Sequence, residues 1–147
     1  MSRVRFTSAR VAAMCKWLGS SLPHLRRAVL AVGRAGLHAD YAESWNRRNP
    51  FYGYCYRVCE TIVRAGKVPS GFQLHRKAIR GETHYFFISP DSGEILDPTA
   101  QQFRRKGYDY RGSRRVGLLP QVSQGARALA QELGWQLKRK KSQNSSR

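Results

Sequence analysis

The sequence predicts an α+β fold in which a helix carrying a cysteine packs on a small antiparallel sheet. Residues 54–65 are compatible with a helix, and Gly66 is a typical helix stop. After this glycine the spacing of apolar residues changes to a period of two, which is typical of strands. We expect the short strands that follow to pair as an antiparallel meander, with a second helix near the C-terminus.

Composition sets the limits within which this fold forms. A chain of 147 residues with 41% hydrophobic residues is long enough for one domain with its own core. The 27 Lys and Arg residues against 9 Asp and Glu give a net charge of +18, which favours nucleic acid, anionic membrane surfaces or acidic proteins as partners. No apolar run reaches the length of about 18 to 20 residues that a membrane span requires.

The cysteine count favours a reducing compartment. Three cysteines are an odd number without a paired framework, so a secreted disulfide scaffold is disfavoured. We therefore expect a cytoplasmic location.

Residues 1–43 form a predicted basic helical extension. Residues 1–39 contain no acidic residue, and arginines are interspersed with apolar residues at helical spacing. Two short amphipathic helices fit, with apolar faces made by Val11, Met14, Trp17 and Leu18 and by Leu22, Leu25, Val29 and Val32. The helices either pack on the rest of the molecule and present a solvated basic face, or hold a polyanion. A transit peptide has the same composition, but the basic bias extends over the whole chain.

The candidate nucleophile, Cys55, lies at the start of the first core helix, directly after a turn. Asn49-Pro50 favours a turn and Gly53 relaxes the backbone, so Cys55 falls in the first turn of the helix. There the helix dipole and unpaired N–H groups stabilise a thiolate. The structural alternative is an inert core cysteine, because Cys55 shares a helical stripe with Val58, Cys59 and Ile62. We expect Cys59, one turn further along, to lie in the core.

Turn chemistry predicts how the strands pair. Residues 72–79 and 83–89 are the first two strands, and the turn at residues 90–93 leads into a third at 94–97, which Pro98 ends. If Ser89 faces Glu94, Asp97 lies opposite Phe86, and His84 lies on the same face two residues along. Such a diagonal pair is about 7 Å apart, within reach of a hydrogen bond. A β-bulge would instead put the two side chains on opposite faces.

Together Cys55, His84 and Asp97 make the minimum set for thiolate catalysis. The imidazole takes the thiol proton and later protonates the leaving group, while the carboxylate orients the ring. His75 is the competing base, on a neighbouring strand. Zinc bound by Cys55, Cys59 and a histidine is the competing chemistry, but a single C-x-x-x-C lacks the second cysteine pair. We expect no metal and no organic cofactor.

Three motifs follow one another along the chain: Asn49-Pro50-x-x-Gly53-x-Cys55, then His84-Tyr85, then Asp97-Pro98-Thr99 followed by Gln102-Phe103. In this order they resemble a group of small papain-like cysteine-hydrolase-fold proteins, the YunG-like group, which is common in phages and bacteria. For a phage-encoded protein, the expected cytoplasmic location is the host cytoplasm. The resemblance covers about the middle two thirds of the chain. The sequence departs from the pattern of the group at Tyr54, where a smaller polar residue is usual, and in the arginine-rich segment 111–117.

The resemblance implies a papain-like α+β core at residues 44–137. It implies Cys55 as nucleophile, His84 as general base and acid, and Asp97 as the orienting acid. The Cys55 N–H would donate to the oxyanion, with Asn49 or Tyr52 as a second donor, and Gln102 would support the cleft. The implied activity is a cysteine hydrolase or acyl-transfer enzyme acting on an amide, isopeptide or thioester bond, with a protein among the candidate substrates.

We expect one helix and a basic tail in the C-terminal part of the chain. Residues 123–137 are helical with Ser123 as N-cap, and residues 138–147 form a basic, disordered tail. The candidate contacts to nucleic acid are basic residues of the segment 111–117 and of the tail: Arg111, Arg114, Arg115, Lys138, Arg139, Lys140 and Lys141. They motivate the alternative function, a non-catalytic nucleic-acid-associated phage accessory protein on a papain-like scaffold.

Overall fold

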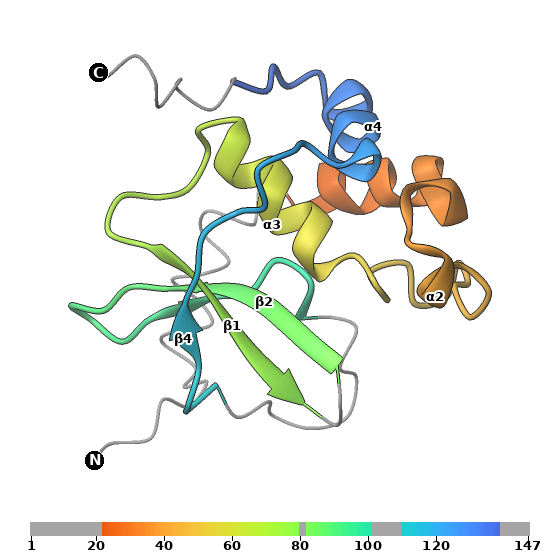
Figure 1. Cartoon of the computed structure of the whole chain (residues 1–147). Coiled ribbons are helices and arrows are strands. Elements are labelled where there is room, and N and C mark those ends of the chain that lie inside the picture. The colour runs from red at the N-terminus through yellow and green to blue at the C-terminus, as the bar shows by residue number, and fades with distance from the viewer. Residues whose placement is uncertain (1–21, 80–81, 101–109, 139–147) are drawn as a thin grey trace.

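A computed structural model describes residues 22–79, 82–100 and 110–138 (Figure 1). Residues 22–32 are helical and continue into a 3-10 turn. The later elements, in chain order, are η1 (Gly33–Gly36), α2 (Ala39–Ala42), α3 (Cys55–Arg64), β1 (Gln73–Ile79), β2 (Glu82–Ile88), β3 (Ile95–Leu96), β4 (Arg114–Arg115) and α4 (Gln124–Leu133). The fold is therefore mixed α+β, as the sequence predicts.

The strands form one four-stranded antiparallel sheet in the order β3-β2-β1-β4. Between β2 and β3 the pairs are Phe87 with Leu96 and Ile88 with Ile95, which is the register that the turn predicts. The Ser89 N–H donates to the Glu94 carbonyl over 2.9 Å and closes this turn. No bulge interrupts the paired residues, so the face assignment of His84 and Asp97 holds.

The largest hydrophobic core lies between the sheet and the helices. In Figure 1, α3 lies across one face of the sheet, and its Val58, Cys59 and Ile62 are fully buried. These side chains cluster with Leu74, Phe87, Leu96 and Leu129 from β1, β2, β3 and α4. A second, smaller cluster contains Phe86, Ile95 and Tyr110.

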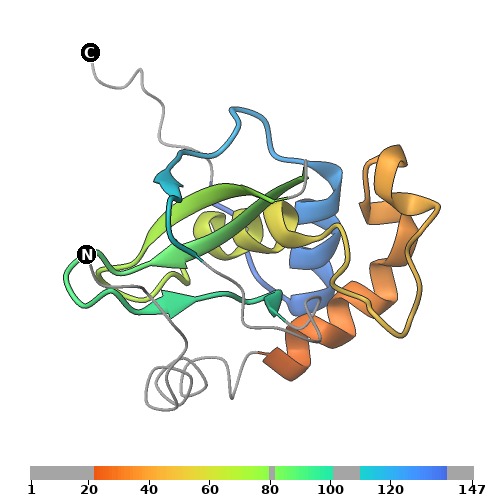
Figure 2. The ribbon, with the colours of Figure 1, turned by 90° about the horizontal axis from the view of Figure 1, so that it is seen from below.

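Residues 22–36, which the sequence analysis assigned to an extension, share the larger core. Leu25 and Val29 are fully buried in the cluster that α3 and α4 also build, while Leu22 and Val32 pack against it. Seen from below, this segment and α4 lie side by side (Figure 2). The core therefore begins before residue 44. The first predicted helix, with Val11 and Trp17, lies outside the described residues.

The last helix, α4, has the predicted cap but ends earlier than expected. The Ser123 side chain accepts a hydrogen bond from the Ala126 N–H over 3.1 Å. Gly134 then adopts the left-handed conformation with φ of 70°, and the Trp135 N–H donates back to the Ala130 carbonyl. This closure ends the helix at Leu133 instead of residue 137. Among the described residues, no helix is long and apolar enough to cross a bilayer.

Candidate active site

The turn before α3 places Cys55 at the first position of the helix. Tyr54 occupies the N-cap position but does not cap the helix with its side chain. Its hydroxyl donates to the Gly33 carbonyl over 2.6 Å, and both Tyr54 and Phe51 are fully buried. The packed tyrosine ties the turn to the N-terminal helical segment, and so fixes where α3 begins. Cys55 is therefore the first residue of α3, as the sequence predicts, in the turn whose N–H groups have no partner within the helix.

Two predicted supporting residues lie in this same turn. The Asn49 N–H donates to the Asn46 side chain, and the Tyr52 N–H donates to the Asn49 carbonyl. The Tyr52 ring meets Tyr41 of α2 edge to face, at 5.8 Å between centroids. Both residues therefore lie on the segment that approaches Cys55, and their role as oxyanion donors stays a prediction. Gln102 lies outside the described residues.

Cys55 and Cys59 have different environments although they lie one turn apart. The Cys55 thiol is half-buried and donates to the Thr83 carbonyl over 3.6 Å. Cys59 is fully buried in the core, and desolvation, together with the charges of Asp97 and Cys55, raises its pKa well above the ordinary value. The two cysteines thus separate into an accessible thiol at a helix N-terminus and an inert core thiol.

The predicted contact between His84 and Asp97 is present. The His84 Nε2–H donates to Asp97 Oδ2 over 2.7 Å, and the two residues are 4% and 2% exposed. His84 lies on β2 and Asp97 directly follows β3, so the strand register brings them together. The His84 ring also forms a hydrogen bond with Cys55, one of the interactions that raise the pKa of His84. With Nε2 engaged by Asp97, the Nδ1 atom remains for the thiol.

Electrostatics keep the His84 ring protonated across the neutral range. Burial lowers the pKa of His84, but the charge and hydrogen bond of Asp97, with those of Cys55, outweigh it and raise this pKa to about 9. The charged His84 ring and the positive end of the α3 dipole therefore both lie next to the Cys55 side chain.

Asp97 has two further partners that the sequence did not predict. The Tyr110 hydroxyl donates to Oδ2 over 2.7 Å, and Thr99 donates to Oδ1 through its N–H at 3.2 Å and its hydroxyl at 3.5 Å. All three residues are almost fully buried. The Thr99 contact is an Asx turn, which the Asp-Pro-Thr spacing signals. Tyr110 has no local signal, because only the tertiary fold brings it to a carboxylate 13 residues away.

His75, the competing base, lies in a different environment. Its Nδ1 is 3.0 Å from the Ser113 hydroxyl, and its ring is 6.4 Å from Phe86. Burial and the nearby Arg115 guanidinium lower the pKa of His75, so its ring is neutral. Cys55 is not among its partners, which leaves His84 as the histidine at the thiol.

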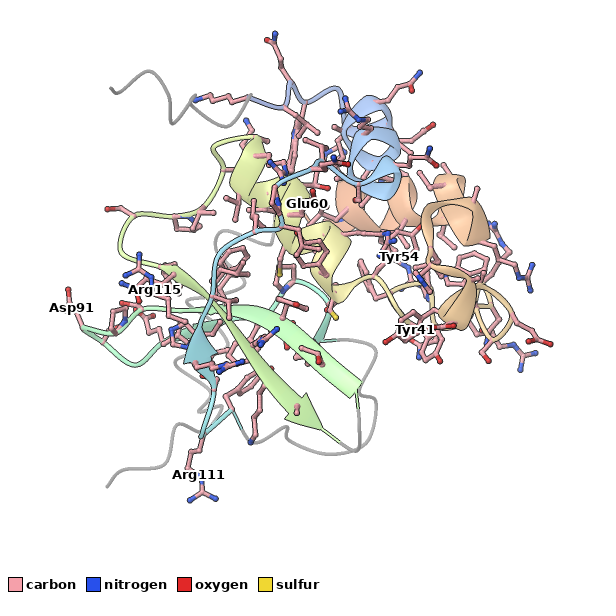
Figure 3. The ribbon with its side chains drawn as sticks, in the orientation of Figure 1. Tyr41, Tyr54, Glu60, Asp91, Arg111 and Arg115 are labelled. Carbon is pink, nitrogen blue, oxygen red and sulfur yellow. The ribbon has the colours of Figure 1, made fainter. Side chains whose placement is uncertain are left out.

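The basic residues predicted to contact nucleic acid separate into two places. Arg111, Arg114 and Arg115 are exposed at and before β4, and Figure 3 shows Arg111 and Arg115 on the β4 side of the sheet. The Lys138 N–H instead donates to the Arg64 carbonyl, at the far end of α3 from Cys55. Arg139, Lys140 and Lys141 lie outside the described residues.

Within the described part of the chain, no group of three or more His, Cys, Asp and Glu side chains is placed to hold a metal ion.

Comparison with known proteins gives no match, whether to a family model, to a curated protein or to a solved structure. The function is therefore inferred from the residues and geometry of the site.

Proposed function

We propose that this protein is a cysteine hydrolase or acyl-transfer enzyme that attacks an amide, isopeptide or thioester bond with Cys55. The observation that carries the proposal is the His84 ring, which is hydrogen-bonded to Asp97 on one side and to Cys55 on the other. A cysteine at a helix N-terminus, next to a histidine on an antiparallel strand, is also what supports a papain-like assignment of the α+β fold.

The chemistry runs through two proton transfers at His84. The ring holds the proton of the Cys55 thiol, and the thiolate forms a bond to the substrate carbonyl carbon. His84 then protonates the leaving amine or thiol as the bond to it breaks, which leaves an acyl thioester on Cys55. A water that gives its proton to His84 hydrolyses the thioester, whereas an incoming amine or thiol completes an acyl transfer.

The N-terminus of α3 suits the oxyanion that forms in each step. The Cys55 N–H belongs to the first turn, whose N–H groups no N-cap side chain engages. We assign the second donor to the turn segment that carries Asn49 and Tyr52, because it directly precedes the nucleophile. A reducing compartment suits this chemistry, since Cys55 must remain a free thiol.

Acylation by p-nitrophenyl acetate tests the proposal without knowledge of the substrate. We expect a burst of p-nitrophenol equal to the enzyme concentration and an acetyl group that peptide mapping places on Cys55. Cys59→Ala is the control, because it removes a thiol and leaves the burst. His84→Gln is expected to slow acylation by about 100-fold or more, since general-base catalysis contributes that much. If acetylation avoids Cys55, or is equally fast without His84, the protein is the non-catalytic alternative.

A further inference from the structure

Three side chains form a row across the sheet on the α3 side, which we call the Tyr85–Arg76–Arg114 row. Tyr85 of β2 is directly opposite Arg76 of β1, and Arg76 is directly opposite Arg114 of β4. Residues that are directly opposite one another share a face of the sheet. The strand neighbours two positions away, Leu74, Phe87 and Val116, pack in the core that α3 builds, so the row lies on that same face.

The row begins beside Cys55. The Tyr85 ring meets Tyr56, the residue after Cys55, edge to face at 4.9 Å between centroids. Thr83, two positions before Tyr85 on β2, accepts the hydrogen bond of the Cys55 thiol. With strand dimensions of about 3.4 Å per residue and about 5 Å between strands, the backbone positions of Arg76 and Arg114 are roughly 8 Å and 12 Å from Thr83.

The two arginines carry unbalanced charge. Like charges on directly opposite strand positions repel each other. Neither Arg76 nor Arg114 forms an ion pair with a carboxylate of the described residues, unlike Arg64, which pairs with Glu60. Arg114 is exposed and Arg76 is half-buried. An anion that bridges both guanidinium groups would convert this repulsion into charge-assisted hydrogen bonds.

We propose that the Tyr85–Arg76–Arg114 row binds an acidic segment of a polypeptide substrate whose scissile carbonyl lies at Cys55. The inference rests on the proposed function. An extended peptide advances about 3.4 Å per residue, so the acidic side chains are expected two to four residues from the scissile bond. A peptide fits better than a nucleic acid, because the group that reacts with Cys55 is an acyl carbon and the Tyr85 ring is already packed on Tyr56.

Matched electrophilic peptides test the inference. The probes carry a vinyl sulfone at one end, or a chloroacetyl group at the other, with either Glu or Gln at the positions two and four residues from the electrophile. We expect the Glu probe to label Cys55 about tenfold faster than the Gln probe in one of the two series, as charge-assisted contacts predict. Arg76→Gln and Arg114→Gln are expected to abolish this preference. Arg127→Gln is the control, because it removes an exposed arginine of α4 and the same net charge.

Iodoacetamide separates failure of the inference from failure of the proposed function. It is neutral and too small to reach from Cys55 to Arg76, so its rate with Cys55 reports the thiolate alone. Fast alkylation of Cys55 with equal labelling by Glu and Gln probes would overturn the inference and leave the proposed function standing. Alkylation as slow as that of Cys59 would overturn both.

Binding of a single-stranded oligonucleotide tests whether the Tyr85–Arg76–Arg114 row contacts nucleic acid instead. If it binds the protein, loses affinity in Arg76→Gln and Arg114→Gln but not in Arg127→Gln, and the peptide probes show no preference, the row is a nucleic-acid contact and the inference is wrong. If Arg127→Gln lowers the affinity for the oligonucleotide as much as Arg76→Gln and Arg114→Gln do, the oligonucleotide binds through the general positive charge of the protein. The preference for the Glu probe over the Gln probe then decides whether the inference holds.

Discussion

At the scale of single residues, the site depends on how Asp97 is held. Its two oxygens accept hydrogen bonds from His84, Tyr110 and Thr99, so the buried carboxylate has partners on both sides. This arrangement fixes the carboxylate, and the carboxylate fixes the His84 ring. Of these contacts, the His84 contact follows from turn chemistry and strand alternation, which are local in sequence.

The protonation of His84 makes stability depend on pH. Its pKa is about 9 in the folded protein, above the ordinary value of 6.5, so proton binding stabilises the folded state. The contribution is fully present below about pH 6.5 and is lost as pH rises to 9, with a total on the order of 3 kcal/mol. We expect urea unfolding of the natural sequence to show this loss relative to His84→Gln.

Asp97→Asn is the companion variant for that measurement. Without the carboxylate, burial lowers the pKa of His84 and the extra loss of stability between pH 6.5 and 9 disappears. A difference between the natural sequence and His84→Gln that stays constant over this range would show that the ring does not take up a proton on folding.

At the scale of elements, a buried ion pair fastens α4 to α3. Glu60 is fully buried and accepts hydrogen bonds from Arg64 Nε at 2.9 Å, from the Ser123 N–H at 3.1 Å and from the Ser123 hydroxyl at 2.7 Å. Arg64 in turn donates to the Leu119 carbonyl over 2.7 Å. The pair thereby holds the segment that connects β4 to α4 against the back of α3.

Removing one partner of this pair is expected to cost more than removing both. Glu60→Ala leaves a buried, uncompensated guanidinium and should lower the free energy of unfolding by about 3 to 5 kcal/mol. The double variant Glu60→Leu with Arg64→Met replaces the pair by apolar groups and should lose clearly less. Denaturant midpoints measure both changes. Equal or additive losses would mean that the pair contributes hydrogen bonds to the backbone and little mutual charge compensation.

The elements that the sequence predicts are those whose signals are local. Residues 72–79 alternate loosely and residues 83–89 are rich in aromatic and β-branched residues. Turn residues bound both segments, and β1 and β2 form there. β4 consists of only Arg114 and Arg115 in a segment without apolar alternation, so nothing local indicates it. No local signal indicates the burial of Glu60 either, because its partner Ser123 is far away in the sequence.

At the scale of the whole molecule, one core connects segments that the sequence suggests are separate. A domain boundary near residue 43 follows from the change in composition, yet Leu25 and Val29 lie in the same cluster as Ile62 and Leu129. Composition describes the solvated face of a helix as much as its buried face, so a basic helix and a packed helix have the same signature. The net charge of +18 is therefore no guide to where the domain begins.

The measurement that tests the central claim most directly is the rate of alkylation by iodoacetamide of Cys55 against Cys59, by peptide mapping, between pH 5 and 9. If His84 and the N-terminus of α3 activate Cys55, it reacts at neutral pH at least about 100-fold faster than the core thiol, and His84→Gln removes most of this advantage. Two cysteines that react slowly and alike, or a Cys55 that His84→Gln leaves unchanged, would contradict the account.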